Sequence, residues 1–122
     1  MTDVAPLILY VEDEPLVREI VVLEFEDAGF RVREAEDGVS ALAIIDAGTR
    51  FDALVTDIRM PGGVDGLRVA EHARAAYPSL PVLYATGFAP DPLRIVPGGR
   101  LFAKPVGVAA MIMALGELGV RP

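Results

Sequence analysis

Four short apolar runs of this chain each end on side chains that could take part in metal or phosphoryl chemistry. The side chains are Glu12 with Asp13, Asp57, Thr86 and Lys104. Crowded carboxylates repel one another unless a cation intervenes, and Mg²⁺ prefers oxygen ligands. A carboxylate can also accept a phosphoryl group, whose outer oxygens a metal, an ammonium and a hydroxyl can bind. These residue types therefore match a magnesium-dependent phosphoryl acceptor, provided that the fold brings the four run ends together.

Each of these residues also has a plainer interpretation when it is taken alone. Glu12 and Asp13 could be acids at the start of a helix, where the helix dipole favours negative charge. Thr86 could be an ordinary β-branched strand residue, Lys104 a solvated side chain, and Asp57 a solvated acid that ends a strand. The argument for a site is that all of them fall at the ends of predicted strands.

Predicted strands alternate with predicted helices along the whole chain. The strands are predicted at Leu7–Val11, Phe30–Ala35, Ala53–Asp57, Pro81–Ala85 and Leu101–Ala103. The helices are predicted from Pro15 to about Ala28, from Asp37-Gly38 through Ile45, from Asp65-Gly66 to before Pro78, and from Val106 to Leu118. This alternation indicates a parallel sheet with right-handed crossovers, whose strands end at a common edge. Ligands of open α/β sheets bind at that edge, so we expect the polar strand ends to form one site.

The composition fits a single globular domain spanning residues 1–122. Apolar residues make up 52% of the chain, and its net charge of −7 argues against nucleic acid as a direct partner. The chain has no cysteine, which permits a reducing cytoplasm, and its first residues do not resemble a signal peptide. The longest nearly apolar run, Val106 to Gly116, is too short to span a bilayer. We therefore expect a cytoplasmic protein with no membrane partner.

Taken together, these motifs resemble the receiver domain of bacterial two-component response regulators. The resemblance covers essentially the whole chain, and its motifs are Val11–Glu14, Asp57–Pro61, Asp65-Gly66, Thr86 and Lys104-Pro105. It implies an α/β, flavodoxin-like, doubly wound fold with a five-stranded parallel sheet in the order 2-1-3-4-5. It also implies that a sensor histidine kinase or a histidine phosphotransfer protein donates a phosphoryl group to Asp57.

The same resemblance implies a role for each residue of the site. The implied Mg²⁺ ligands are Asp13, Asp57 and the backbone carbonyl of Arg59, with Glu12 assisting. Mn²⁺ or Ca²⁺ would be possible substitutes for Mg²⁺. Lys104 and Thr86 would contact the phosphoryl group, and the Lys104-Pro105 bond is usually cis in this family.

The chain departs from the family pattern in three places. The stretch Met60 to Gly66 is one residue longer than is common, and Leu101 stands where the family usually has a switch Tyr or Phe. Between Thr86 and Lys104 the chain carries several helix breakers, namely Pro90, Pro92, Pro97 and Gly98-Gly99. Because an interior proline costs a helix about 3 kcal/mol, we expect the usual fourth helix to be short, displaced or absent. We expect the Gly87–Gly99 segment, ordered through Thr86, to act as the switch instead.

The segment Pro81–Phe88 is similar to the Phe-Ala-Thr-Gly-Tyr signature of the FATGUY subfamily. Members are often stand-alone receivers, although similar stretches occur in receiver modules of hybrid kinases. The chain shows no output domain after its last helix, so we expect it to signal through a phosphorylation-dependent protein–protein interaction with an effector. One alternative is a phosphate sink or relay carrier for a shared kinase. Another is a metal-dependent aspartyl phosphatase, which is disfavoured because Arg59 replaces the second acid; we expect no enzymatic activity beyond the protein's own phosphotransfer and dephosphorylation.

The last predicted helix has apolar residues around nearly its whole circumference. They are Val106, Val108, Met111, Ile112, Met113, Leu115 and Leu118, and Glu117 is its one charged residue. A helix on the outside of a doubly wound sheet needs only one apolar stripe. We therefore expect the surplus side chains to form a contact for a homodimer, a kinase or an effector. The alternative is that they pack under the Gly87–Gly99 segment.

Overall fold

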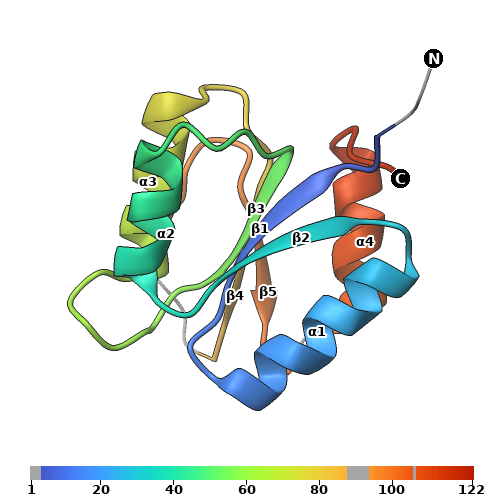
Figure 1. Ribbon diagram of the computed structural model, residues 1–122, viewed down its shortest axis with the longest axis horizontal. Coiled ribbons are helices and arrows are strands. Elements are labelled where there is room, and N and C mark those ends of the chain that lie inside the picture. Colours follow the sequence, from blue (N-terminus) through green and yellow to red (C-terminus); the bar gives the residue numbers. More distant parts are fainter. Residues whose placement is uncertain (1–3, 88–93, 106) are drawn as a thin grey trace.

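A five-stranded parallel sheet lies between two pairs of helices (Figure 1). The structure, a computed structural model, describes residues 4–87, 94–105 and 107–122. In sheet order the strands are β2 (Arg31–Ala35), β1 (Leu7–Val11), β3 (Ala53–Asp57), β4 (Val82–Thr86) and β5 (Arg100–Ala103). The helices in the described ranges are α1 (Pro15–Asp27), α2 (Gly38–Asp46), α3 (Gly66–Ala76) and α4 (Val108–Glu117). Helices α1 and α4 cover one face and α2 and α3 the other, which confirms the flavodoxin-like prediction and the strand order 2-1-3-4-5.

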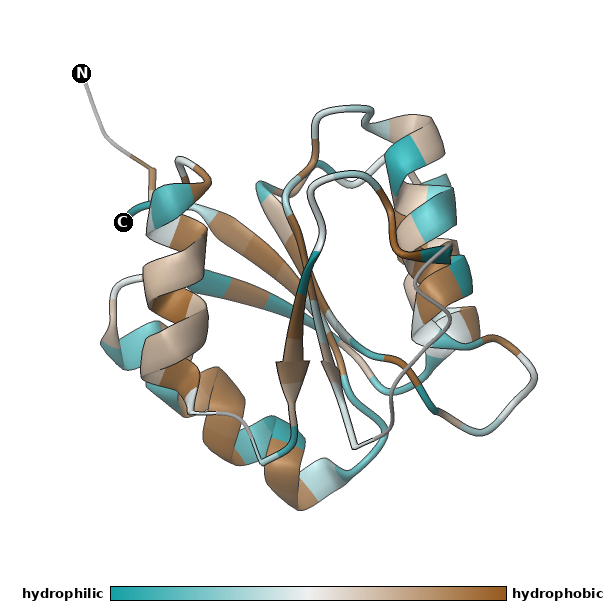
Figure 2. Ribbon diagram, turned by 180° about the vertical axis from the view of Figure 1, so that it is seen from behind, coloured by the Kyte–Doolittle hydropathy of each residue, from teal (hydrophilic) through white to brown (hydrophobic). Residues whose placement is uncertain are grey.

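The three central strands are buried on both faces of the sheet. Leu9 and Leu54 belong to the core beneath α2 and α3, whereas Ile8 and Val55 belong to the core beneath α1 and α4. This burial explains why the sequence runs of these strands show no polar alternation. Figure 2 shows hydrophobic colouring along much of the strands and along α4. None of the helices in the described ranges is both long and apolar enough to cross a membrane.

The helix starts follow the signals in the sequence. Asp37 caps α2 by accepting a hydrogen bond from the Ser40 N–H at 2.7 Å, and Asp65 caps α3 by accepting one from the Arg68 N–H at 2.9 Å. Pro15 is the first residue of α1, where its missing N–H costs nothing. These caps begin two of the helices directly after loops of the site edge, so they help to place that edge.

Several apolar residues with helical spacing in α1 do not form its buried face. Leu16, Ile20 and Leu23 are exposed, whereas Val22 and Phe25 enter the core. The Phe25 ring packs edge-on against two other aromatic rings, those of Tyr10 and Phe30. The position of these rings fixes the rotation of α1, and that rotation leaves an apolar stripe facing outward.

The prediction of a largely exposed apolar surface on the last helix is wrong for most of its residues. Val108, Met111 and Leu115 are buried, and Ile112 and Leu118 are partly buried. They pack with α1 and the sheet, because α4 lies beside α1. The alternative, packing under the Gly87–Gly99 segment, falls largely on residues 88–93, which lie outside the described residues. Met113 alone among these described residues is exposed, at 70%, while Val106 lies outside the described residues.

The connection from β4 to β5 contains no α-helix in its described residues, Gly87 and 94–99. The buried Tyr84 hydroxyl accepts a hydrogen bond from the Val96 N–H at 3.1 Å, and Arg94 forms an ion pair of 3.0 Å with Glu71 of α3. The end of the connection is therefore anchored to β4 and α3. The prolines at positions 90 and 92, on which the prediction of a degraded helix partly rests, lie outside the described residues.

Candidate functional site

The parallel sheet brings three predicted carboxylates together at the carboxyl ends of β1 and β3. The residues are Glu12, Asp13 and Asp57, and one oxygen from each lies within 4.8 Å of the others. The β1–β3 register pairs Val11 with Thr56, which places the next residues of both strands side by side. Glu12 is only 2% exposed and Asp57 only 7%, so two of the three acids are buried.

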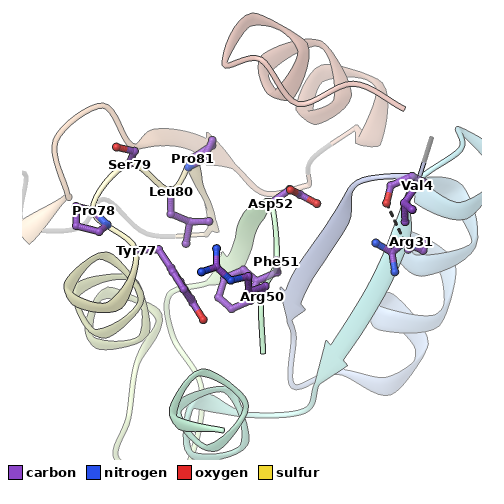
Figure 3. Close-up of a pocket in the computed structure, with 11 residues that line it drawn as sticks. Val4, Arg31, Arg50, Phe51, Asp52, Tyr77, Pro78, Ser79, Leu80 and Pro81 are labelled. Atoms are coloured by element: carbon purple, nitrogen blue, oxygen red, sulfur yellow. Dashed lines mark hydrogen bonds between the residues drawn. The ribbon is translucent and has the colours of Figure 1, made fainter. Parts of the chain in front are cut away.

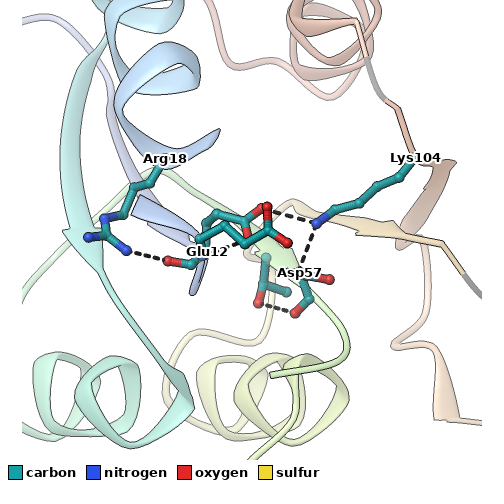
Figure 4. Close-up of polar contacts among 6 residues, drawn as sticks. Glu12, Arg18, Asp57 and Lys104 are labelled. Atoms are coloured by element: carbon teal, nitrogen blue, oxygen red, sulfur yellow. Dashed lines mark hydrogen bonds and ion pairs between the residues drawn. The ribbon is translucent and has the colours of Figure 1, made fainter. Parts of the chain in front are cut away.

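Lys104 joins this cluster from the other side of the sheet edge (Figure 4). Its Nζ donates to Asp57 Oδ2 at 2.9 Å and to Glu12 Oε1 at 3.1 Å. The Lys104 N–H donates to the Thr86 carbonyl at 2.8 Å, and the Lys104-Pro105 peptide bond is cis. The ammonium therefore lies between two buried carboxylates that come from different strands.

Burial and charge act in opposite directions on these groups. Burial raises the pKa of Glu12, although the hydrogen bond from the Glu14 N–H and the nearby Lys104 ammonium oppose that shift. Burial alone would lower the pKa of Lys104, but its hydrogen bonds and charge interactions with Asp57 and Glu12 outweigh burial and raise it. Lys104 is therefore held as a cation beside the acids.

Thr86 and Arg59 both lie near the acidic cluster, Thr86 on the strand next to β3 and Arg59 in the loop after β3. Thr86 is the last residue of β4 and is 4% exposed, and its neighbour Ala85 pairs with Asp57 across the sheet. Arg59 follows Asp57 by two residues in the loop after β3, and its side chain is exposed. All six predicted residues thus belong to one edge of the sheet.

Two further residues bind main-chain atoms of the site and were not singled out from the sequence. Arg18 Nη1 donates to the Glu12 carbonyl at 2.7 Å, and Thr56 Oγ1 donates to the Asp57 carbonyl at 2.7 Å. The sequence does carry a weak signal for Thr56, since a hydroxyl interrupts an otherwise apolar buried run. Nothing in the local pattern distinguishes Arg18 from a surface charge of α1.

The donor set fits a hard divalent cation. Three carboxylates, two of them buried, converge within the distance that one small ion can bridge. Mg²⁺ binds one or two carboxylates, keeps several waters and contacts substrate phosphates, and this cluster opens to solvent through the partly exposed Asp13. Glu12, Asp13 and Asp57 would therefore hold Mg²⁺.

A different hollow lies at the opposite edge of the sheet, where the strands begin (Figure 3). Its volume is about 650 Å³, and Arg50, Phe51 and Tyr77 are among its lining residues. The carboxylate of Asp52 at this hollow accepts a hydrogen bond from the Leu7 N–H at 2.8 Å and so has a structural partner. The acid cluster therefore remains the candidate site.

Comparison with known proteins identifies the family of this chain. The response regulator receiver domain model matches residues 8–96. Response regulator MprA of Mycobacterium avium (strain 104) is 43% identical over 79 residues, which make up 65% of this chain and 34% of that protein. The chain thus spans about a third of the length of this relative.

Solved structures extend the likeness over nearly the whole chain. A response regulator receiver protein from Sinorhizobium medicae WSM419 is 33% identical with a TM-score of 0.87, covering 93% of this chain and 94% of that one. The receiver domain of the hybrid histidine kinase CckA is 29% identical with a TM-score of 0.79, covering 92% and 97%. TrrA of Thermotoga maritima, solved in complex with Mg²⁺-BeF, is 26% identical with a TM-score of 0.82, covering 93% and 98%. The chain therefore belongs to the response regulator receiver domain family of two-component systems.

Proposed function

We propose that Asp57 is the phosphoryl acceptor of this receiver domain and that a histidine kinase or histidine phosphotransfer protein is the donor. The observation that carries the proposal is the 2.9 Å contact between Asp57 Oδ2 and the Lys104 ammonium inside a cluster of acids. In the transfer, a carboxylate oxygen of Asp57 attacks the phosphorus. The phosphorus–nitrogen bond of the donor breaks, and the released imidazole nitrogen keeps the bonding electron pair.

The residues around Asp57 divide the work of placing and neutralising the phosphoryl group. The Lys104 ammonium, which already donates a hydrogen bond to Asp57, would donate to one oxygen of the phosphoryl group. Thr86, at the end of the adjacent strand, would offer its hydroxyl to a second oxygen. Asp13, Asp57 and the Arg59 carbonyl, with Glu12 assisting, would hold Mg²⁺. The bound ion would supply positive charge to a third oxygen. Mn²⁺ or Ca²⁺ would be possible substitutes.

An apolar surface beside the site supports a protein as the phosphoryl donor. Leu16, Ile20 and Leu23 are exposed along α1, which begins directly after the acids of β1. A groove of about 470 Å³ lies next to this stripe, and its lining includes Val17 of α1 and Lys104 itself. Exposed apolar patches of this kind tend to mark interaction sites. We propose that the donor protein docks on α1 and thereby brings its phosphohistidine to Asp57.

The downstream role is a phosphorylation-dependent interaction with an effector protein. The stretch Tyr84–Gly87 supports membership of the FATGUY-like, stand-alone receivers, while Phe88, at the second aromatic position of that signature, lies outside the described residues. The CckA likeness keeps a phosphate sink or relay role as the second candidate, since that receiver comes from a hybrid kinase. A pull-down with and without beryllofluoride separates the two, because only the effector role requires a partner retained by the phosphoryl mimic.

Two variants test the proposed function against a purified donor kinase. Asp57→Asn keeps the shape of the side chain and removes its nucleophilic carboxylate, so it should take no phosphoryl group from either a kinase or a small phosphodonor. Ile20→Glu changes only the exposed α1 stripe, so it should lose transfer from the kinase and keep transfer from the small donor. Wild-type labelling of Asp57→Asn would refute the acceptor, and wild-type kinase transfer to Ile20→Glu would refute the docking surface.

A further inference from the structure

The main-chain carbonyl of Glu12 lies just beyond the end of the β1–β2 pairing. The Glu12 N–H still donates to the Ala35 carbonyl of β2 at 3.1 Å, but Ala35 is the last residue of that strand. The Glu12 carbonyl instead accepts a hydrogen bond of 2.7 Å from Arg18 Nη1, as Figure 4 shows. Arg18 is in turn ion-paired through Nε with Glu34 of β2 at 3.4 Å, and its side chain is 17% exposed. A guanidinium from α1 thus holds the peptide that joins Glu12 and Asp13, the two acids that follow β1.

The main-chain carbonyl of Asp57 is held in a comparable way at the end of β3. Thr56 is fully buried, and its Oγ1 donates to the Asp57 carbonyl at 2.7 Å. Gly66, the first residue of α3, approaches the same carbonyl so closely that a Cβ at Gly66 would lie 1.8 Å from the oxygen. The Gly66 N–H also donates to the Ile58 carbonyl at 2.7 Å. The peptide after Asp57 is therefore fixed between a hydroxyl and the start of a helix.

We propose that Arg18 and Thr56 are positioning residues that set the separation of the β1 and β3 acids by holding the carbonyls of Glu12 and Asp57. Both side chains reach the site through these main-chain carbonyls, so both act through the backbone. Loss of either hydrogen bond leaves a carbonyl to find a new donor, which rotates the peptide and moves the attached carboxylate. Displacements of about 1 Å can cost a reaction about 100-fold, so small rotations should be measurable.

Since this inference rests on the proposed phosphorylation of Asp57, the experiment follows that reaction with a small donor. Thr56→Val removes the hydroxyl and keeps the shape, while Thr56→Ser keeps the hydroxyl. Arg18→Met removes the guanidinium, Arg18→Lys keeps a donor, and Arg33→Met is a control at an exposed arginine of β2. Each protein is phosphorylated with phosphoramidate across a MgCl₂ titration, and the rise in melting temperature with MgCl₂ is measured without phosphoramidate.

We expect Thr56→Val and Arg18→Met to react about tenfold more slowly and to need more MgCl₂ for half of the melting-temperature rise. Thr56→Ser and Arg33→Met should stay within about twofold of the wild type, and Arg18→Lys should recover part of the loss. If folded Thr56→Val and Arg18→Met keep the wild-type rate and MgCl₂ dependence, the inference is overturned. A loss of stability without a change in rate or MgCl₂ dependence would overturn it as well. If Thr56→Val does not fold, the Arg18 pair decides in the same way. A wild-type protein that takes no phosphoryl group would instead refute the proposed function.

Discussion

Removing the hydroxyl of Tyr84 should destabilise the protein far more than its size suggests. Tyr84 is fully buried, and its hydroxyl oxygen is the acceptor that the described residues offer to the Val96 N–H, at 3.1 Å. Tyr84→Phe keeps the ring and its packing, so it creates almost no cavity, but it leaves a buried N–H without an acceptor. An unsatisfied buried donor costs about 1–3 kcal/mol. With a urea m value of roughly 1–3 kcal/mol per M, a loss of about 2 kcal/mol lowers the urea midpoint by about 1 M.

A second tyrosine provides the matched control for this prediction. The Tyr77 hydroxyl donates to the Thr49 carbonyl at 2.9 Å, but both residues are partly exposed, so water can replace the hydroxyl. Tyr77→Phe should therefore cost about 1 kcal/mol or less. The unfolding of both variants in urea is followed by circular dichroism, and the free energies of unfolding are compared provided that the m values are equal. If Tyr84→Phe lies within about 0.5 kcal/mol of the wild type, or costs no more than Tyr77→Phe, the anchoring of the β4–β5 connection by Tyr84 is wrong.

Three further predictions concern the metal, the outer surface and the alkaline limit of stability. Because Mg²⁺ would bind only the folded acid cluster, millimolar Mg²⁺ should raise the melting temperature at matched ionic strength, and Asp13→Asn should shrink that rise; no rise in the wild type would count against a metal site. Met113→Glu adds charge at a 70% exposed position, so it should leave the melting temperature unchanged and weaken any homodimer or effector contact through α4; unfolding would show that Met113 is core. Burial raises the pKa of Tyr84, so its stabilising contribution is complete below the ordinary tyrosine pKa of about 10 and is lost at higher pH. The free energy of unfolding, measured in urea, should therefore fall above about pH 10, and it should fall less steeply in Tyr84→Phe. Equal dependence on pH in the two proteins would show that Tyr84 is not a cause.

The parts of the molecule that local sequence determines were predictable. Buried runs without polar alternation marked the central strands, and Asp37 and Asp65 marked helix starts that the structure shows as side-chain caps. Parallel topology then placed the strand ends, and with them Glu12, Asp57 and Lys104, at one edge without any need for side-chain detail. Contacts that depend on how elements pack were not predictable in this way.

Packing between helices decided the features that the sequence misjudged. The apolar circumference of α4 indicated a free surface, but α4 lies against α1 as well as the sheet, so Val108 and Met111 are buried. Conversely, Ile20 lies on an apolar stripe of α1 that is exposed, because α1 buries Val22 and Phe25 instead. The hydrogen bond from Arg18 to the Glu12 carbonyl depends on the rotation of the same helix, which the packing of Phe25 against Tyr10 helps to set.

The most direct test of the account is to locate the phosphoryl group on the protein. The wild type and Asp57→Asn are incubated with phosphoramidate and MgCl₂, the acyl phosphate is trapped by borohydride reduction, and the modified residue is identified by peptide mass spectrometry. We expect modification of the wild type at Asp57 alone, dependence on MgCl₂, and no modification of Asp57→Asn. Modification at another residue, or equal modification of both proteins, would contradict the assignment of Asp57 as the acceptor.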